Sequence, residues 1–197
     1  MRTARVLFVI LFLGALAASC GSSDNKSSSS TVSTTPSPAP FTSTAETSTT
    51  SQATGGATTP VSVAVTHPAA HLVAVRAARQ DTVDRVVFEF TERVPGYKVA
   101  YGNKPIVGTS GKEVPLAGSA ALVVHMEQAS GFNQDTGQQT YSGPRQLQPP
   151  GTRAVKEVAQ VEDFEAVLNW AIGVQGDFPF RVSTLASPPR LVIDIPS

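Results

Sequence analysis

Cysteine is nearly absent from this chain, because Cys20 is the only one among 197 residues. Residues 61–197 therefore cannot form a disulfide, and their fold must depend on a hydrophobic core. A segment of this length can bury such a core as a single domain. A lone thiol exposed in an oxidising compartment invites unwanted pairing, so Cys20 needs an explanation of its own.

An excess of charge of either sign is also absent, since 15 Lys and Arg residues face 15 Asp and Glu residues. Residues 61–197 carry 12 basic and 13 acidic side chains, with no run of basic residues. This balance argues against nucleic acid as a partner. It also argues against strong electrostatic docking on anionic lipids.

The sequence has no motif that is typical of an enzyme. Neither Gly-x-Ser-x-Gly nor His-Glu-x-x-His occurs in it. His67 and His71 are four residues apart but have no acidic neighbour, so they do not predict a metal site. His125 could act as a base beside Glu127, although an ordinary pair on a sheet surface is the simpler interpretation. We expect no catalytic residue, no cofactor and no metal.

Residues 1–19 have the pattern of a secretory signal peptide. Arg2 and Arg5 precede an apolar stretch at residues 6–16, which is too short to span a bilayer, and small residues follow it. The pattern resembles the lipobox of bacterial lipoproteins, with alanine where that family favours leucine three residues before the cysteine. The resemblance implies palmitate-type lipidation of Cys20 and a membrane anchor on the extracytoplasmic face. An ordinary signal peptide is the alternative.

Residues 20–60 are predicted to form a disordered linker after the lipidated cysteine. Ser, Thr, Ala, Pro and Gly dominate this segment, and it contains very few charged or aromatic residues. Such a composition cannot bury enough apolar surface to offset the entropy lost on ordering. O-glycosylated stalks have a similar composition, and a plain spacer is the alternative.

Residues 61–197 contain short segments in which apolar and polar side chains alternate. Val86, Phe88 and Phe90 share one face of such a segment, and Leu191, Ile193 and Ile195 share one face of another. The segments with this period of two are 73–77, 85–90, 121–126, 180–183 and 191–195. Turn residues such as Pro95-Gly96 separate them, and residues 108–112 have the composition of a hairpin turn. The pattern predicts one all-β domain, an antiparallel β-sandwich.

Residues 164–174 fit two kinds of structure. Phe164, Ala166, Leu168, Trp170, Ile172 and Val174 would share one face of a strand. Positions 164, 167, 168, 171 and 172 would equally form the apolar face of a helix. We favour the strand, with a hairpin turn at residues 161–163 before it, and we expect Trp170 to lie in the core.

A long polar loop at residues 127–153 is the first place to look for a binding site, because loops of this length in compact domains are usually functional or disordered. Aromatic faces can pack against sugar rings, and amides can hydrogen-bond to hydroxyl groups. The candidate ligand-binding residues in or beside loops are Tyr97, Tyr101, Phe132, Asn133 and Tyr141. The simpler alternative is that the two tyrosines at 97 and 101 belong to the core.

The domain also resembles a known family. The segments that carry the resemblance are 84–90, 95–97, 163–170, 172–173, 180–182 and 188–195. In this order they are similar to the AMIN-like domain of actinobacterial secreted proteins and lipoproteins, over residues 72–195. The resemblance implies a β-sandwich related in character to AMIN domains, which are non-catalytic and bind peptidoglycan beside amidases and secretins. No amidase domain accompanies the module here.

Two functions from different classes follow. The first is a non-catalytic, lipid-anchored module of the cell envelope that binds peptidoglycan or a wall-associated protein. The second is a carrier or sensor of a small apolar ligand inside the sandwich. A cavity lined by Phe88, Phe90, Leu168 and Trp170 would favour the second, whereas a close-packed core would weigh against it.

Overall fold

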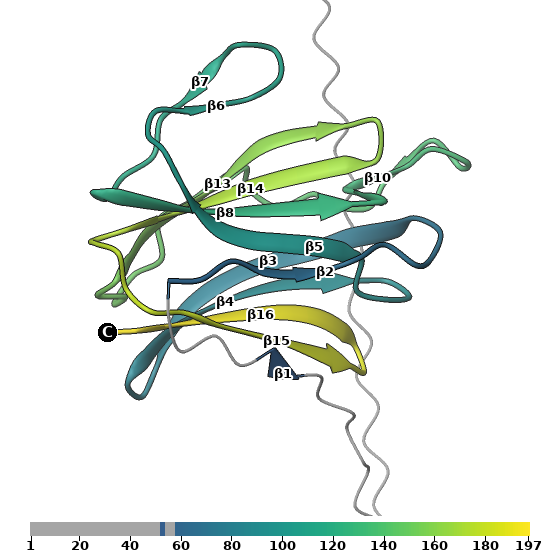
Figure 1. The fold of residues 1–197 in the computed structure, drawn as a ribbon. Coiled ribbons are helices and arrows are strands. Elements are labelled where there is room, and N and C mark those ends of the chain that lie inside the picture. The colour runs from purple at the N-terminus through teal and green to yellow at the C-terminus, as the bar shows by residue number, and fades with distance from the viewer. Residues whose placement is uncertain (1–51, 54–57) are drawn as a thin grey trace, which may run out of the picture. The chain divides into compact units, whose positions relative to one another are not determined.

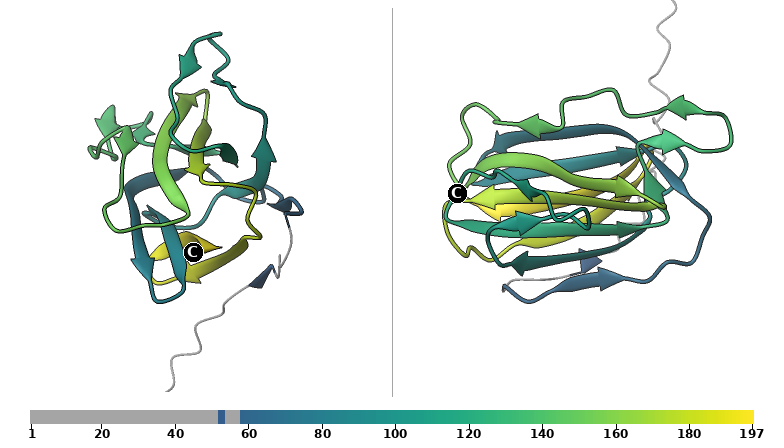
Figure 2. Two further views of the ribbon diagram at one scale, coloured as in Figure 1. Left: turned by 90° about the vertical axis from the view of Figure 1, so that its left-hand side faces the viewer. Right: turned by 90° about the horizontal axis from the view of Figure 1, so that it is seen from above.

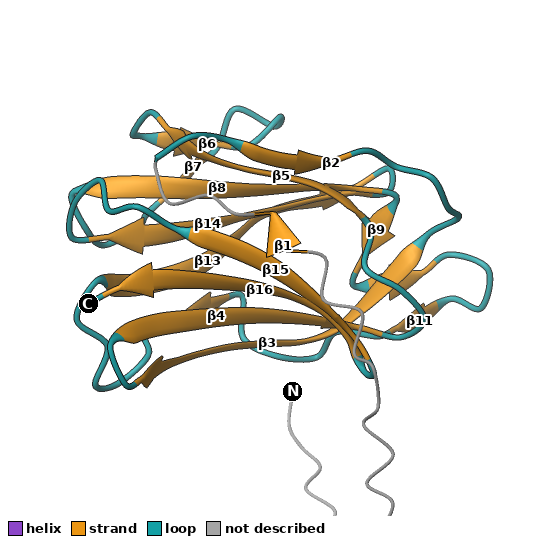
Figure 3. Cartoon of the chain, turned by 60° about the horizontal axis from the view of Figure 1, so that its bottom comes forward, coloured by secondary structure: helices purple, strands orange, loops and turns teal. Residues whose placement is uncertain are grey.

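The computed structural model describes residues 52–53 and 58–197, and the regular elements among them are β-strands (Figure 3). No helix that could cross a membrane was found in this part of the chain. The predicted signal peptide, Cys20 and the linker up to residue 51 lie outside the described residues.

Two six-stranded sheets pack face to face as a β-sandwich (Figure 1). Sheet A contains, in spatial order, β1 (Gln52–Ala53), β15 (Arg181–Ala186), β16 (Pro189–Pro196), β4 (Val83–Phe90), β3 (Ala70–Gln80) and β9 (Ala129–Ser130). Sheet B contains β12 (Gln146–Leu147), β13 (Val155–Phe164), β14 (Val167–Val174), β8 (Ala120–Glu127), β5 (Gly96–Gly102) and β2 (Val61–Val63). The predicted all-β sandwich is confirmed, and its pairs are antiparallel except for the parallel pair of β3 and β9.

Two short hairpins project from this sandwich. One joins β6 (Ile106–Val107) to β7 (Glu113–Val114), and the other joins β10 (Phe132–Asn133) to β11 (Gln138–Gln139). The turned views in Figure 2 show the β6–β7 hairpin standing beyond the body of sheet B. Gly108 N–H donates to Lys112 O at 3.1 Å, so the hairpin turn expected at residues 108–112 is present.

Ordered strand structure begins inside the range predicted as linker. Gln52 and Ala53 pair with Ser183 and Val182 of β15 and so form one edge of sheet A. Because this strand precedes residue 61, a boundary of the domain at residue 61 stays a prediction.

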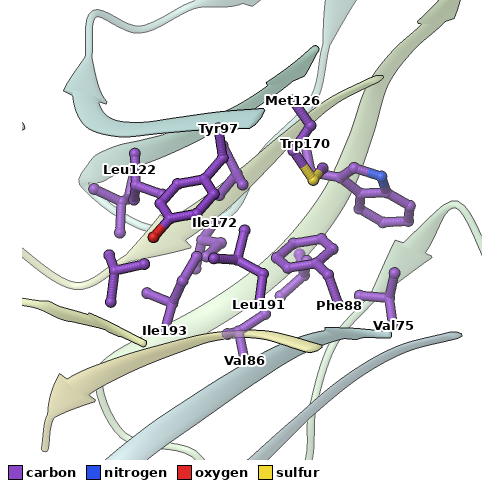
Figure 4. Packing of buried hydrophobic residues seen from close by; sticks show 14 of the residues in the cluster. Val75, Val86, Phe88, Tyr97, Leu122, Met126, Trp170, Ile172, Leu191 and Ile193 are labelled. Atoms are coloured by element: carbon purple, nitrogen blue, oxygen red, sulfur yellow. The ribbon is translucent and has the colours of Figure 1, made fainter. Parts of the chain in front are cut away.

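The core forms between the two sheets from the faces that alternation predicted. Val86, Phe88 and Phe90 of β4 are buried, as are Leu191, Ile193 and Ile195 of β16. Side chains of sheet B meet them, including those of Leu122 and Ile172 (Figure 4). Leu168 belongs to the same cluster. Each buried side chain of this kind contributes about 1.5–3 kcal/mol by removing its apolar surface from water.

Trp170 lies in this core, as expected. Its ring meets Phe88 edge-on with ring centroids 5.8 Å apart, and it meets Tyr141 in the same way at 5.6 Å. Phe88, Phe90, Leu168 and Trp170 are at most 1% exposed, and all four belong to one cluster of packed, buried side chains. This close packing weighs against a carrier of an apolar ligand in the sandwich interior.

The ambiguous segment forms a strand, which confirms our preference, but the position of its hairpin turn was predicted wrongly. Strand β13 continues through residues 161–163 to Phe164, and the turn consists of Glu165 and Ala166. Both turn residues have positive φ, at 49° and 60°, as a two-residue hairpin of type I′ requires. Neither is a residue that usually marks such a turn, so the sequence concealed it. Phe164 consequently lies at the hairpin tip and is 62% exposed instead of buried.

This turn predicts a stabilising substitution. Ala166→Gly is expected to raise the free energy of unfolding by up to about 1 kcal/mol, because glycine adopts positive φ without the Cβ clash. Urea denaturation of the full chain measures the change. Ala100→Gly on β5 is the control and should lower stability, since φ is not positive there. An Ala166→Gly variant no more stable than the parent would contradict the assignment of strain to this turn.

Candidate functional site

The long polar loop at residues 127–153 runs from the end of β8 to the start of β13, and its first part lies beside the tip of the β13–β14 hairpin. Thr140 Oγ1 in the loop donates to Leu72 O of β3 at 2.9 Å, and the N–H groups of Thr140 and Tyr141 both donate to Gly131 O. These bonds hold the loop against sheet A. They give a fixed position to side chains that sequence alone leaves in an irregular segment.

A cavity of about 460 Å³ lies between the loop and the hairpin tip. Its lining residues come from both: Ser130, Gly131, Phe132, Gln134, Gln139, Tyr141, Gly143, Arg145, Gln160, Asp163, Phe164 and Glu165. We call this cavity the loop cleft. It combines aromatic rings with amides, carboxylates and one guanidinium, which is the composition expected for a neutral, hydroxyl-rich ligand.

Two aromatic rings at the loop cleft are unusually exposed. Phe132 is 43% exposed on β10, and Phe164 is 62% exposed at the end of β13. Exposed large apolar side chains that gather at one place commonly mark a binding surface. These two rings offer apolar faces against which a sugar ring could pack.

Asp163 supplies a carboxylate of fixed orientation beside these rings. Its Oδ1 accepts a hydrogen bond from Ser130 Oγ at 2.8 Å, and its Oδ2 accepts one from Gly131 N–H at 2.9 Å. An ionised carboxylate has about four acceptor sites, so Asp163 keeps capacity for a ligand hydroxyl. Sequence reasoning did not single out Asp163 for this role, because its partners are 32 and 33 residues away along the chain.

Tyr141 forms the inner wall of the loop cleft. It is only 4% exposed, its ring packs edge-on against Trp170, and its O–H donates to Pro144 O at 2.7 Å. Burial raises the pKa of this tyrosine above its ordinary value. Tyr141 therefore supports the cavity from behind, while Phe132 presents its ring to solvent.

Asn133 shapes the β10–β11 hairpin. Its Oδ1 accepts hydrogen bonds from the N–H groups of Asp135 and Thr136 at 2.9 and 3.1 Å, and its backbone carbonyl accepts one from Gly137. This is the side-chain turn that asparagine commonly makes. A contact of Asn133 with a ligand stays a prediction.

Tyr97 and Tyr101 lie elsewhere, on β5 of sheet B. Tyr97 is 5% exposed in the core, where burial raises its pKa. Tyr101 is half-buried, and its O–H donates to Phe178 O at 2.8 Å. The structure thus brings Phe132 and Tyr141 together at the loop cleft and separates both from the β5 tyrosines.

His125 lies on the outer face of sheet B, as sequence alternation predicted. Its Nδ1 is 2.7 Å from Asn169 Oδ1, and its Nε2 is 3.4 Å from Glu127 Oε1. Among the described residues, no group of three or more His, Cys, Asp or Glu side chains has the arrangement of a metal site. His67 and His71 lie before and at the start of β3.

Comparison with known proteins identifies one family. The model of the AMIN-like domain matches residues 70–197, which includes both sheets from β3 onward and the whole loop cleft. Neither a curated protein nor a solved structure matches the chain.

Proposed function

This chain belongs to the AMIN-like domain family, and from that premise we propose that it is a non-catalytic envelope module that binds peptidoglycan at the loop cleft. Membership of the family suggests a role related to peptidoglycan or the cell wall and an extracytoplasmic location. The binding site and the absence of catalysis are proposals beyond that.

The exposed pair of Phe132 and Phe164 is the observation that supports this proposal. Their rings border a cavity that also contains the oriented carboxylate of Asp163 and the amides of Gln134, Gln139 and Gln160. Apolar rings beside hydrogen-bonding groups match a glycan, whose ring faces are apolar and whose edges carry hydroxyl groups. The near-neutral charge of residues 61–197 agrees with a ligand that is recognised by shape and hydrogen bonds.

A sedimentation assay with insoluble peptidoglycan tests the proposal. The full chain with Cys20→Ser, which removes the predicted lipid acceptor, should co-sediment in a saturable way. Phe132→Ala and Phe164→Ala should each weaken retention about tenfold, the equivalent of roughly 1.4 kcal/mol. Both side chains are exposed, so the fold should tolerate their loss.

Leu185→Ala is the matched control, because this half-buried leucine lies on β15 of the other sheet. It should leave retention unchanged. Parent protein that never co-sediments would overturn the proposal and direct the search to a wall-associated protein, which crosslinking in cells can identify. Retention that neither phenylalanine variant weakens would remove the loop cleft as its site.

We further propose that Cys20 carries a lipid that anchors the module to the extracytoplasmic face of the membrane. A cysteine directly after an apolar stretch and small residues supports this assignment. Two acyl chains, at about 0.8 kcal/mol per buried CH₂, anchor a protein stably. Cells fed an alkyne-labelled palmitate should label the parent chain and not Cys20→Ala. Equal labelling of both chains, or of neither, would contradict the anchor.

A further inference from the structure

A row of polar side chains crosses the outer face of sheet B, on strands that are neighbours in space and distant in sequence. Lys98 of β5 is paired with His125 of β8, which is paired with Asn169 of β14, which is paired with Glu162 of β13. We call these four residues the polar row. Adjacent strands lie about 4.7–4.9 Å apart, so the row spans about 14 Å between its end residues.

Hydrogen bonds fix the orientation of one half of the polar row. The imidazole Nδ1 of His125 faces Asn169 Oδ1 at 2.7 Å, and Asn169 Nδ2 donates to Glu162 Oε2 at 3.3 Å. Because the amide oxygen faces the histidine and the amide nitrogen faces the carboxylate, His125 Nδ1 is the donor. Thr109 Oγ1 of the β6–β7 hairpin donates to the other oxygen of Glu162. The carboxylate is thus held in one position before any ligand arrives.

The other end of the polar row carries an available positive charge. Lys98 is exposed, and the ion pairs found among the described residues do not include it. Glu127 is two residues from His125 on the same face of β8. Glu127 lines the same cavity as Lys98, so one end of the row holds a cation with a carboxylate beside it, and the other end holds the fixed carboxylate of Glu162.

Two cavities lie along the polar row and share Val123 and His125 in their linings. A cavity of about 620 Å³ contains Lys98, and one of about 410 Å³ contains Asn169 and Glu162. Ile106 and Val107 of the β6–β7 hairpin line the second cavity together with Val161 of β13. Together the cavities form a trench whose floor is the polar row and whose wall at the Glu162 end is apolar.

We propose that this trench binds a short peptide that has a free amino group and a free carboxylate. The ammonium of the peptide pairs with Glu162, and its carboxylate pairs with Lys98. An extended tripeptide spans about 10 Å, which is shorter than the polar row of about 14 Å. The side chains of Lys98 and Glu162 bridge the remaining distance. Its amide groups lie over His125 and Asn169, which supply hydrogen-bonding partners midway.

The charges in the trench favour this class of ligand over others. A neutral glycan has no charged groups that could pair with Lys98 at one end of the trench and Glu162 at the other. A nucleic acid would require more cations than Lys98 alone. A peptide with charged termini can pair with the charged group at each end of the trench. Hydrogen bonds with an ionised donor or acceptor are stronger than those between neutral groups. The proposal concerns a site separate from the loop cleft and does not depend on the wall-binding assay.

Peptides with blocked termini test the proposal. The full chain with Cys20→Ser is titrated with tri-alanine, with its N-acetylated form and with its C-terminal amide, and NMR follows the backbone amides. Tri-alanine should give saturable shifts that centre on β5, β8, β13, β14 and the β6–β7 hairpin. Each blocked form should bind about tenfold more weakly, because each lacks one charged end.

Variants of the row should reproduce the effect of each blocking group. Glu162→Gln should weaken tri-alanine about tenfold and leave the acetylated peptide unchanged, whereas Lys98→Ala should weaken tri-alanine and leave the amidated peptide unchanged. Glu92→Gln and Arg181→Ala, an exposed residue after β4 and an exposed residue on β15 of sheet A, are the controls and should bind as the parent does. Thermal unfolding verifies that each variant folds.

Three outcomes would overturn the proposal. The first is the absence of saturable shifts at about 10 mM tri-alanine, where a ligand of millimolar Kd would approach saturation. The second is equal binding of the free and blocked peptides, which needs no variant and thus no assumption about folding. The third is shifts that centre on the loop cleft. Loss of peptidoglycan retention alone would leave this site unaffected.

Discussion

An Asp84→Ala variant is expected to lose a large share of the stability of this fold. Asp84 is on the core-facing side of β4 and is fully buried, which is rare for a carboxylate. Its Oδ2 accepts hydrogen bonds from three successive backbone N–H groups, those of Arg153, Ala154 and Val155, at 2.7, 2.6 and 3.0 Å. Its Oδ1 accepts one from Ser197 Oγ at 3.0 Å.

The three N–H groups make the loss large. Alanine leaves these three donors without an acceptor. Those of Ala154 and Val155 are buried, and each unpaired buried group costs about 1–3 kcal/mol. The combined loss is then about 4 kcal/mol or more, against a total stability of about 5–15 kcal/mol for a domain. Asp84 also joins sheet A to the start of β13 in sheet B, where the polar loop ends.

Urea denaturation of the full chain, followed by the fluorescence of Trp170, measures the effect. Asp84→Asn should lose less than Asp84→Ala, because asparagine retains one oxygen that can accept from the three N–H groups. Asp135→Ala removes an exposed carboxylate and is the control, with an expected change within about 0.5 kcal/mol. An Asp84→Ala variant as stable as this control would show that the three hydrogen bonds contribute little.

A Trp170→Ala variant is expected to lose about 3–5 kcal/mol, whereas Trp170→Phe should lose much less. The alanine variant leaves a cavity between Phe88 and Tyr141, which both meet the indole edge-on. Phenylalanine fills most of that space. It also removes Trp170 Nε1, a buried donor with no hydrogen-bond partner in the structure, whose burial costs about 1–3 kcal/mol.

Circular dichroism must follow these two variants, since Trp170 is the only tryptophan in the chain. Trp170→Phe should be nearly as stable as the parent, and Trp170→Ala should be much less stable than both. If Trp170→Phe lost as much stability as Trp170→Ala, the lost packing of the indole would outweigh the gain from removing its unpaired N–H. Tyr141 packs against Trp170, so Trp170→Ala should also weaken peptidoglycan retention through the wall of the loop cleft.

The candidate site was predictable only in part. Composition directed attention to the polar loop, where Phe132 is exposed at a cavity. The same reasoning treated Tyr141 as equivalent, but Tyr141 is a buried supporting residue. It missed Phe164 altogether, because the hairpin turn at Glu165 and Ala166 has no glycine or asparagine to mark it.

One signal in the sequence was available and went unused. Asp84 is separated from Val86, Phe88 and Phe90 by an even number of residues, so alternation places it on the same, core-facing side of β4. A carboxylate in that position indicates a buried group that must find partners. The alternation could not reveal that those partners are the N–H groups of Arg153 to Val155, which are 69 to 71 residues away along the chain.

The sequence by itself determined the all-β class, the main strands and the core faces of β4 and β16, because a period of two is a local property of each segment. Tertiary structure alone decided which strands are neighbours. The register of β5, β8, β14 and β13 aligns Lys98, His125, Asn169 and Glu162, and the course of the polar loop places Phe132 and Phe164 in the lining of one cavity. Pairing and register arise from contacts between distant segments, so neither candidate site could be assembled from local patterns.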